Sequence, residues 1–291
     1  MSKHFTITDF FKRFPTDDAC LDHLMAIRYG DIVTCPKCGK TARFARIRKL
    51  PAYSCPTCGH HIHPMVGTPF ERSRTPLQKW FYAMYLFTTT RNGVAAKELQ
   101  RQLGVTYKCA WRIGHEIRKY MAQTDGDSPL GGRPIVEADE AFVGGYKPGG
   151  MGGKGKTVVF GMVERGGDVI ARVVPNRAEF TIVPHILQNV RRGTRVATDE
   201  HRSYTKLPEE GYYHGTVNHS AKEYVRGQVH TNTIEGFWSW VRRQINGTHV
   251  WVSRKHLPKY LGEMEFRFNL RKRPELMFET LLMAFQRPYN R

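Results

Sequence analysis

Two closely spaced cysteine pairs constrain the N-terminal part of this chain more than any other feature of its sequence. The pairs lie in the segments CPKC and CPTC and are Cys35, Cys38, Cys55 and Cys58. Sixteen residues, 39–54, separate them. Each CPxCG turn directs two thiolates toward one point, and two such turns complete the tetrahedral four-sulfur shell that Zn²⁺ favours. Residues 1–65 are therefore predicted to form a zinc ribbon with one structural Zn²⁺, the alternative being four reduced cysteines without metal.

Residues 66–124 follow a helical pattern that ends in a helix-turn-helix-like segment. The stretches 94–102 and 106–120 are joined by the Gly-containing turn LGV, and Thr106 would cap the second helix. That second helix carries Tyr107, Lys108, Arg112, His115, Arg118 and Lys119. We expect it to bind DNA, with contacts from Tyr107, Lys108 and Arg112. The alternative is an ordinary helical hairpin that packs on the next domain.

The segment DGDSPLGGR, residues 125–133, is rich in Gly, Pro, Asp and Ser and is interpreted as a linker. Beyond it the pattern changes from helical to β-branched. Strands are expected at 134–145, 157–165, 169–175, 195–200 and 211–220, and helices at 181–190 and 231–245. This order predicts an α/β domain with a mixed sheet over residues 134–291, including a C-terminal helical extension.

The segment GMGGKGKT, residues 150–157, formally matches a phosphate-binding loop. That motif needs a helix to open at its Lys-Thr pair, whereas the residues from 157 onward continue as a β-branched strand. We therefore do not expect ATP binding. The stretch 144–156 is interpreted as a flexible basic hairpin loop in which Lys154 and Lys156 contact DNA.

The charge balance indicates the class of partner. Lys and Arg number 45 against 26 Asp and Glu, a formal net charge of +19. Such an excess attracts the phosphate backbone of nucleic acid. The sequence contains neither a signal peptide nor an apolar run of membrane-spanning length, so no membrane partner is expected. The expected location is the cytoplasm, at the nucleoid.

In so basic a chain, carboxylates at the ends of strands are informative. Asp139 (VEADEAFVGG) and Asp199 (VATDEHRSY) each lie in an expected strand, and Glu235 lies near the start of an expected helix. Carboxylates from two strands and a helix suit a pair of Mg²⁺ (or Mn²⁺) ions, because hard cations take oxygen ligands. The alternative is that these acids are solvated and paired with arginines.

Two further residues share the helical face of Glu235. Asn232 lies three positions earlier and could replace it as the third metal ligand, although it could equally cap the helix. Arg242 lies seven positions later and could hold a DNA phosphate, or it could be a solvated helix residue.

The order of these segments resembles a known family. In sequence and order they resemble segments of the DDE transposases of small prokaryotic insertion sequences, in the group with an N-terminal zinc ribbon. The segments are the zinc ribbon, the helix-turn-helix, VEADEAFVGG, TDEHRSY and HTNTIEGFW. The resemblance implies an RNase H-like catalytic domain. It also implies that Asp139 and Asp199 are the first two catalytic acids and Glu235 the third.

The implied activity is metal-dependent cleavage at the ends of the element and joining of the freed 3′-hydroxyls to target DNA. The expected partners are double-stranded DNA, both terminal inverted repeats and target, and further copies of the chain in a homodimer or higher oligomer. Two other functions stay open at this point. One is an RNase H-like nuclease without strand transfer, and the other is a DNA-binding regulator with an inactive catalytic domain.

Overall fold

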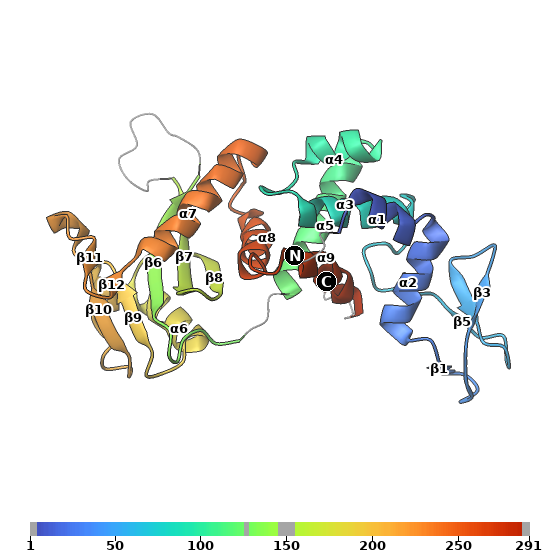
Figure 1. The fold of residues 1–291 in the computed structure, drawn as a ribbon, viewed down its shortest axis with the longest axis horizontal. Helices are drawn as coiled ribbons and strands as arrows, with labels where there is room; N and C mark the ends of the chain where they lie inside the picture. The colour runs from blue at the N-terminus through green and yellow to red at the C-terminus, as the bar shows by residue number, and fades with distance from the viewer. Residues whose placement is uncertain (1–4, 125–127, 145–154, 287–291) are drawn as a thin grey trace. The chain divides into compact units, whose positions relative to one another are not determined.

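The computed structural model describes residues 5–124, 128–144 and 155–286 and divides the chain into two compact units. Unit 1 comprises residues up to 120 together with those from 273 onward, and unit 2 comprises residues 121–272 (Figure 1). Within the described ranges, no helix is both long and apolar enough to cross a membrane.

Unit 1 begins with two helices, α1 (Ile7–Arg13) and α2 (Asp17–Tyr29), which the sequence analysis did not separate from the ribbon. The ribbon follows as an antiparallel pair, β1 (Val33–Thr34) and β2 (Thr41–Ala42), and a three-stranded antiparallel sheet, β3 (Ala45–Ile47), β4 (Ala52–Ser54) and β5 (His61–Ile62). Each cysteine turn ends in a glycine, Gly39 or Gly59, with φ of +70°. Only glycine adopts that angle without strain, which explains the CPxCG pattern.

The helical part of unit 1 contains α3 (Leu77–Thr89), α4 (Ala96–Leu103) and α5 (Tyr107–Thr124). Helix α4 stops at Gly104, whose φ of 59° is left-handed, and α5 begins three residues later. Thr106 Oγ1 accepts a hydrogen bond from the N–H of Cys109, so Thr106 caps α5 as predicted. The two helices and their short turn form the expected helix-turn-helix-like segment.

The C-terminal helix α9 (Met277–Met283) belongs to unit 1. The ring of Phe278 contacts the rings of Phe5, Phe10 and Phe14, and Glu279 forms an ion pair with Arg13. These contacts hold α9 in unit 1. The predicted boundary, in contrast, assigns residues 134–291 to the catalytic domain. The physical reason is apolar burial, since the aromatic face of α9 packs into the N-terminal core.

Unit 2 is built on a five-stranded mixed sheet with the order β10-β9-β6-β7-β8. The strands are β6 (Val136–Val143), β7 (Thr157–Glu164), β8 (Val169–Val174), β9 (Arg195–Thr198) and β10 (Tyr213–Thr216). The first three pair in antiparallel fashion, whereas β9 pairs in parallel with β6 and with β10. This arrangement confirms the predicted RNase H-like mixed sheet. It also confirms that Thr157 begins a strand and not a phosphate-binding helix.

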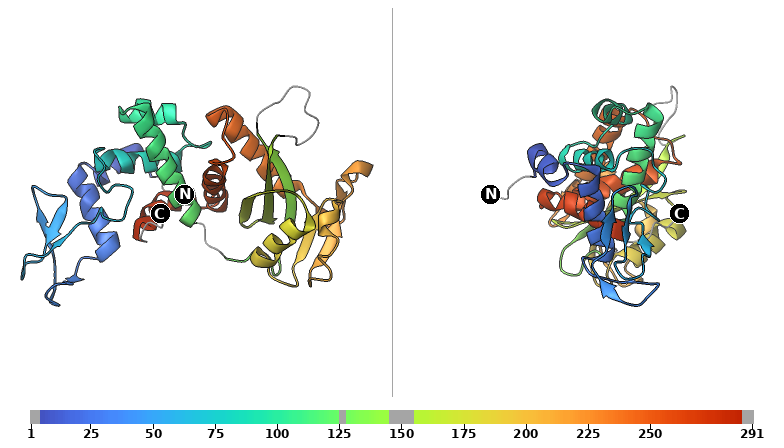
Figure 2. Two further views of the ribbon diagram at one scale, coloured as in Figure 1. Left: turned by 180° about the vertical axis from the view of Figure 1, so that it is seen from behind. Right: turned by 90° about the vertical axis from the view of Figure 1, so that its right-hand side faces the viewer.

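Among the described residues, three α-helices cover the sheet of unit 2, and a short hairpin precedes one of them. Helices α7 (Asn232–Gln244) and α8 (Leu257–Asn269) pack on one face of the sheet and α6 (Glu179–Asn189) on the other (Figures 1 and 2). The hairpin of β11 (Val225–Arg226) and β12 (Val229–His230) precedes α7. Side chains alternate along β6: Val136 and Ala138 face α6, whereas Ala141 and Val143 face α7 and α8.

A glycine in β7 lets α7 approach the sheet. Gly161 pairs directly with Asp139 of β6, and a Cβ atom at Gly161 would lie 2.5 Å from Cζ2 of Trp238 on α7. We predict that Gly161→Ala lowers the free energy of unfolding by about 1–3 kcal/mol, because the added methyl overpacks a filled core. Urea unfolding of the purified protein measures this.

Gly236→Ala on α7 is the matched control, because a Cβ there would meet nothing within 4 Å. It should stabilise the helix by about 0.5–1 kcal/mol, since alanine favours a helix over glycine. Equal effects of the two substitutions would contradict the proposed close approach.

Candidate active site

The geometry of the sheet brings two acids of distant sequence together. Pairing between β6 and β9 covers Val136 and Glu137 opposite Val196 and Ala197. Asp139 and Asp199 lie two residues beyond the last paired position on their respective strands. Asp199 directly follows the carboxyl end of β9, whereas Asp139 lies in the middle of β6, just past the point where its pairing with β9 ends.

A third carboxylate joins them. In the part of the chain that the structure describes, oxygens of Asp139, Glu140 and Asp199 lie within 4.8 Å of one another. Glu140 is not among the predicted site residues, because strand alternation directs it to the face opposite Asp139. Its carboxylate accepts a hydrogen bond of 2.6 Å from the hydroxyl of the buried Tyr204. The acidic doublet Asp139-Glu140 was the signal that could have identified it.

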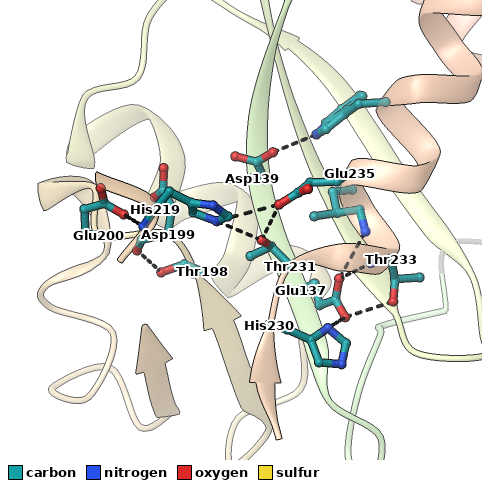
Figure 3. A network of polar contacts seen from close by, with 12 residues as sticks. Glu137, Asp139, Thr198, Asp199, Glu200, His219, His230, Thr231, Thr233 and Glu235 are labelled. Atoms are coloured by element: carbon teal, nitrogen blue, oxygen red, sulfur yellow. Dashed lines mark hydrogen bonds and ion pairs between the residues drawn. The ribbon is translucent and has the colours of Figure 1, made fainter. Parts of the chain in front are cut away.

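Glu235 lies outside this group of three but beside it. It occupies the first turn of α7 with an exposed side chain, across from Asp139 (Figure 3). Its Oε1 accepts a 2.7 Å hydrogen bond from Thr231 Oγ1 and lies 3.6 Å from His219 Nε2. Asn232 is the first residue of α7 and is exposed, and Arg242 is exposed near the end of the helix.

Burial and mutual repulsion make two of these acids hard to ionise. Burial raises the pKa of Asp139 to about 7, and the charges of Glu140, Asp199 and Glu235 add to the effect. Burial likewise raises the pKa of Glu140 to about 7, against the opposing hydrogen bond from Tyr204. A divalent cation would remove this repulsion and takes carboxylate oxygens as ligands. The donor set therefore fits Mg²⁺ or Mn²⁺.

Trp238 fixes the orientation of Asp139. Its indole Nε1 donates a 3.1 Å hydrogen bond to Oδ2 of Asp139. Trp238 lies three residues after Glu235 and therefore on the same side of α7. One face of this helix thus presents both a carboxylate and a hydrogen-bond donor toward β6.

A separate carboxylate holds the start of α7. Glu137 is fully buried and accepts hydrogen bonds from the backbone N–H groups of Thr233 (2.7 Å) and Ile234 (3.0 Å). It also pairs with Arg165 at 2.6 Å. Thr231 is the N-cap residue of α7, but its side chain makes no capping hydrogen bond. A carboxylate from the neighbouring strand takes that role, while the Thr231 hydroxyl donates to Glu235 (Figure 3).

The segment after β9 positions His219. Oxygens of Glu200 accept hydrogen bonds from the N–H groups of His219 (3.0 Å) and Ser220 (3.1 Å) and from the Ser220 hydroxyl (2.6 Å). These bonds, led by that of the Ser220 hydroxyl, lower the pKa of Glu200 to about 2. A permanently charged Glu200 thus holds the short turn that places the His219 ring beside Glu235 (Figure 3).

The four ribbon cysteines form a second cluster. They are free thiols whose sulfurs lie within 4.8 Å of one another. Sγ of Cys35 is 3.6 Å from that of Cys58, and Sγ of Cys38 is 3.8 Å from that of Cys55. A tetrahedron with Zn–S bonds of about 2.3 Å has edges of about 3.8 Å, so the sulfurs fit a zinc ion.

Family models match both regions. Residues 129–269 match a model described as the ISXO2-like transposase domain, and residues 15–61 match a transposase zinc-ribbon domain. The chain belongs to the ISXO2-like transposase family.

Two relatives agree with this membership. An uncharacterized protein in transposable element ISH50 of Halobacterium salinarum is 29% identical over 285 residues, which is 90% of this chain and 94% of that protein. An uncharacterized transposase-like protein of Haemophilus influenzae is 34% identical over 97 residues, which is 33% of this chain and 77% of that protein. Membership of a transposase family implies that the chain binds DNA and that its zinc-ribbon cysteines hold a structural Zn²⁺.

The helix-turn-helix of this transposase exposes the three residues that are predicted to contact DNA. Tyr107, Lys108 and Arg112 are exposed on the first turns of α5. The guanidinium of Arg112 also lies 5.3 Å from the Trp80 ring centroid, so it contributes to packing. His115 and Arg118 are buried. These two residues of the predicted helix therefore face the core of unit 1.

The remaining predicted DNA contact is the basic loop before β7. Lys156 is exposed. Lys154 lies outside the described residues.

We predict that the purified protein contains one zinc per chain and that Cys55→Ser removes it. Structural zinc sites bind with roughly 10–16 kcal/mol at pH 7, so loss of a ligand should unfold the ribbon. Elemental analysis and limited proteolysis measure both effects. Cys109→Ser is the control, because Cys109 lies outside the cluster. Fewer than about 0.5 zinc ions per wild-type chain would contradict the prediction.

We also predict that Asp139→Asn stabilises the metal-free protein by an amount that grows between pH 5 and pH 8. The folded Asp139 carboxyl keeps its proton to about pH 7, whereas an unfolded Asp loses it near pH 4. Raising the pH through this window therefore destabilises the wild type relative to the variant. Thermal unfolding at each pH measures the difference.

The comparison with the variant is needed because the half-buried His185 and His214 change the stability with pH in the opposite direction. Burial lowers their pKa values, so their contribution to stability increases as the pH rises through 6.5. The control is Glu209→Gln, which removes a carboxylate from an exposed site and so measures any general effect of losing one negative charge. A constant difference for Asp139→Asn across the range would argue against a raised pKa.

Proposed function

We propose that this transposase cleaves DNA phosphodiesters at the ends of an insertion sequence and joins the freed 3′-hydroxyls to target DNA. The observation that carries the proposal is the group of acids where β6 and β9 separate, with Glu235 beside it on α7. Two parallel strands and one helix supply oxygens to a single place, which a phosphoryl-transfer site with divalent cations requires.

Asp139 and Asp199 would hold the divalent cations, Mg²⁺ or Mn²⁺. When bound, such ions activate the attacking oxygen and neutralise the phosphate that is being transferred. The chain's own task is positioning. Trp238 Nε1 orients Asp139 Oδ2, and the N–H of His201 donates to Asp199 Oδ1 at 3.0 Å. No protein nucleophile is required, because water or a DNA 3′-hydroxyl attacks the phosphorus.

Glu235 is our choice for the third ligand, in preference to Asn232 and Glu140. Glu140 lies closer to the two aspartates, but one of its oxygens accepts a hydrogen bond from the Tyr204 hydroxyl on the α6 side of the sheet. Glu235 faces Asp139 from α7 and contributes to the raised pKa of that acid. A carboxylate also gives a hard cation a full charge, whereas the Asn232 amide offers one neutral oxygen.

DNA would be held by residues from both units. We propose contacts from Tyr107, Lys108 and Arg112 on α5, from Lys154 and Lys156 before β7, and from Arg242 on α7. Assembly of two or more chains on the DNA is part of the same proposal, because each element has two ends to be joined.

We predict that Asp139→Asn, Asp199→Asn and Glu235→Gln each lower metal-dependent cleavage by about 10²–10³-fold or more, because each removes charge from the metal site. Asn232→Ala and Glu140→Gln should lower it by less than about tenfold. The assay incubates the protein with Mg²⁺ and labelled DNA from the inverted repeats that flank its gene. Products are resolved as cut ends and as strand-transfer molecules.

Binding to the same DNA without metal is the control, and all five variants should retain it. A larger loss for Asn232→Ala or Glu140→Gln than for Glu235→Gln would transfer the third ligand role to that residue. Cutting without joined products would identify a nuclease. Binding without cutting would identify a DNA-binding regulator.

A further inference from the structure

The chain makes an unusual turn just beyond α7. A wider π-helical turn, Ile245–His249, extends the helix, and Val250 follows with φ of 63° and ψ of −49°. The N–H of Trp251 donates to the carbonyl of His249 at 2.6 Å, which closes a three-residue turn around Val250. Positive φ is costly for a β-branched residue, by about 1–3 kcal/mol, and such strain concentrates at functional sites.

This strained turn carries two exposed apolar side chains. Val250 is 80% exposed and Trp251 is 62% exposed. The residues on either side are anchored: Val252 is buried in the core between sheet and helices, and the His249 ring lies 4.8 Å from that of Tyr260. The backbone is therefore held so that an indole and an isopropyl group project into solvent. We call Val250 and Trp251 the apolar tip.

The charged residues that lie near the apolar tip in the sequence are all of one sign. Residues 236–262 include no Asp or Glu. The same stretch contains the cations Arg242, Arg243, Arg254, Lys255 and Lys259. Arg254 and Lys255, next to the tip, are exposed. A second copy of this chain would bring a like charge to such a surface, whereas DNA offers phosphates for the cations and apolar base faces for the tip.

We infer that the apolar tip is a base-stacking element, in which Trp251 stacks on an unpaired or unstacked DNA base and Val250 fills the adjoining step. Arg254 and Lys255 would neutralise flanking phosphates. The helical rise of about 1.5 Å per residue puts His249 about 20 Å from Glu235, or about six base pairs of B-DNA. The element would thus distort DNA several base pairs from the acids. This placement rests on the proposed function, but stacking itself does not.

The test measures DNA binding without metal, in a background of Asp139→Asn, so that catalysis cannot affect the result. The probes are two duplexes of the element end, one fully paired and one with unpaired thymines about six base pairs from the cleavage position. Trp251→Ala should weaken binding to the unpaired probe by about tenfold or more, and Trp251→Phe should retain most of the affinity. The slope of affinity against salt should not change, since stacking releases no counterions.

The matched control is Phe180→Ala, which removes an aromatic side chain of 78% exposure from α6. It should leave both affinities unchanged. Val250→Gly should weaken binding to the unpaired probe without lowering the melting temperature, because glycine accepts the positive φ. This combination separates stacking from a role in folding.

Several results would overturn the inference. One is an affinity for the unpaired probe that Trp251→Ala leaves unchanged or that Phe180→Ala lowers equally. Another is loss of binding to phosphatidylserine vesicles with DNA binding intact, which would make a membrane the partner. A change in sedimentation of the free protein upon Trp251→Ala would make a second copy the partner. Cleavage of element ends is scored separately, so failure of the proposed activity would not alter these outcomes.

Discussion

A buried carboxylate holds the elements of unit 2 together. Glu137 is the second residue of β6 and has no solvent exposure, and its charge is compensated by N–H groups at the start of α7 and by Arg165 after β7. Arg165 in turn donates to the carbonyl groups of Gln228 and His230 in the β11–β12 hairpin. Because an uncompensated buried charge is very costly, the strand, the helix and the hairpin are fixed to one another.

The same strand shows how a structural acid differs from acids suited to a metal. Glu137 accepts hydrogen bonds from two backbone N–H groups and a hydroxyl and forms an ion pair with a guanidinium, so its charge is compensated within the protein. Two residues further on, Asp139 accepts one hydrogen bond, from the indole N–H of Trp238, and faces three other carboxylates. Burial and these neighbouring charges raise its pKa to about 7. The fold therefore supplies the orientation of Asp139 but leaves its charge to be balanced by a cation.

Much of this architecture could be predicted from local patterns. The cysteine spacing and the β-branched runs indicated the ribbon and the positions of the strands along the chain, because both signals come from residues near in sequence. Glu140 was missed because strand alternation separates it from Asp139, and only the divergence of β6 and β9 brings both to Asp199. The start of α7 likewise depends on a residue distant in sequence, because Glu137, 96 residues before Thr233, accepts the backbone N–H groups of the first turn. Likewise, the periodicity of α5 did not reveal that His115 and Arg118 face the core.

Within unit 2, helix α7 connects the turn that carries Glu235 to the strained turn at Val250. At its start, Glu137 fixes the turn that carries Glu235, and beyond its end, Val252 and the His249–Tyr260 contact fix the strained turn at Val250. A strained backbone persists only where its surroundings determine it, and here anchors lie on both sides. An acid and an exposed indole are thus held at a set separation on one rigid element. Such a helix can couple the position of a DNA base to that of the phosphate at the acids.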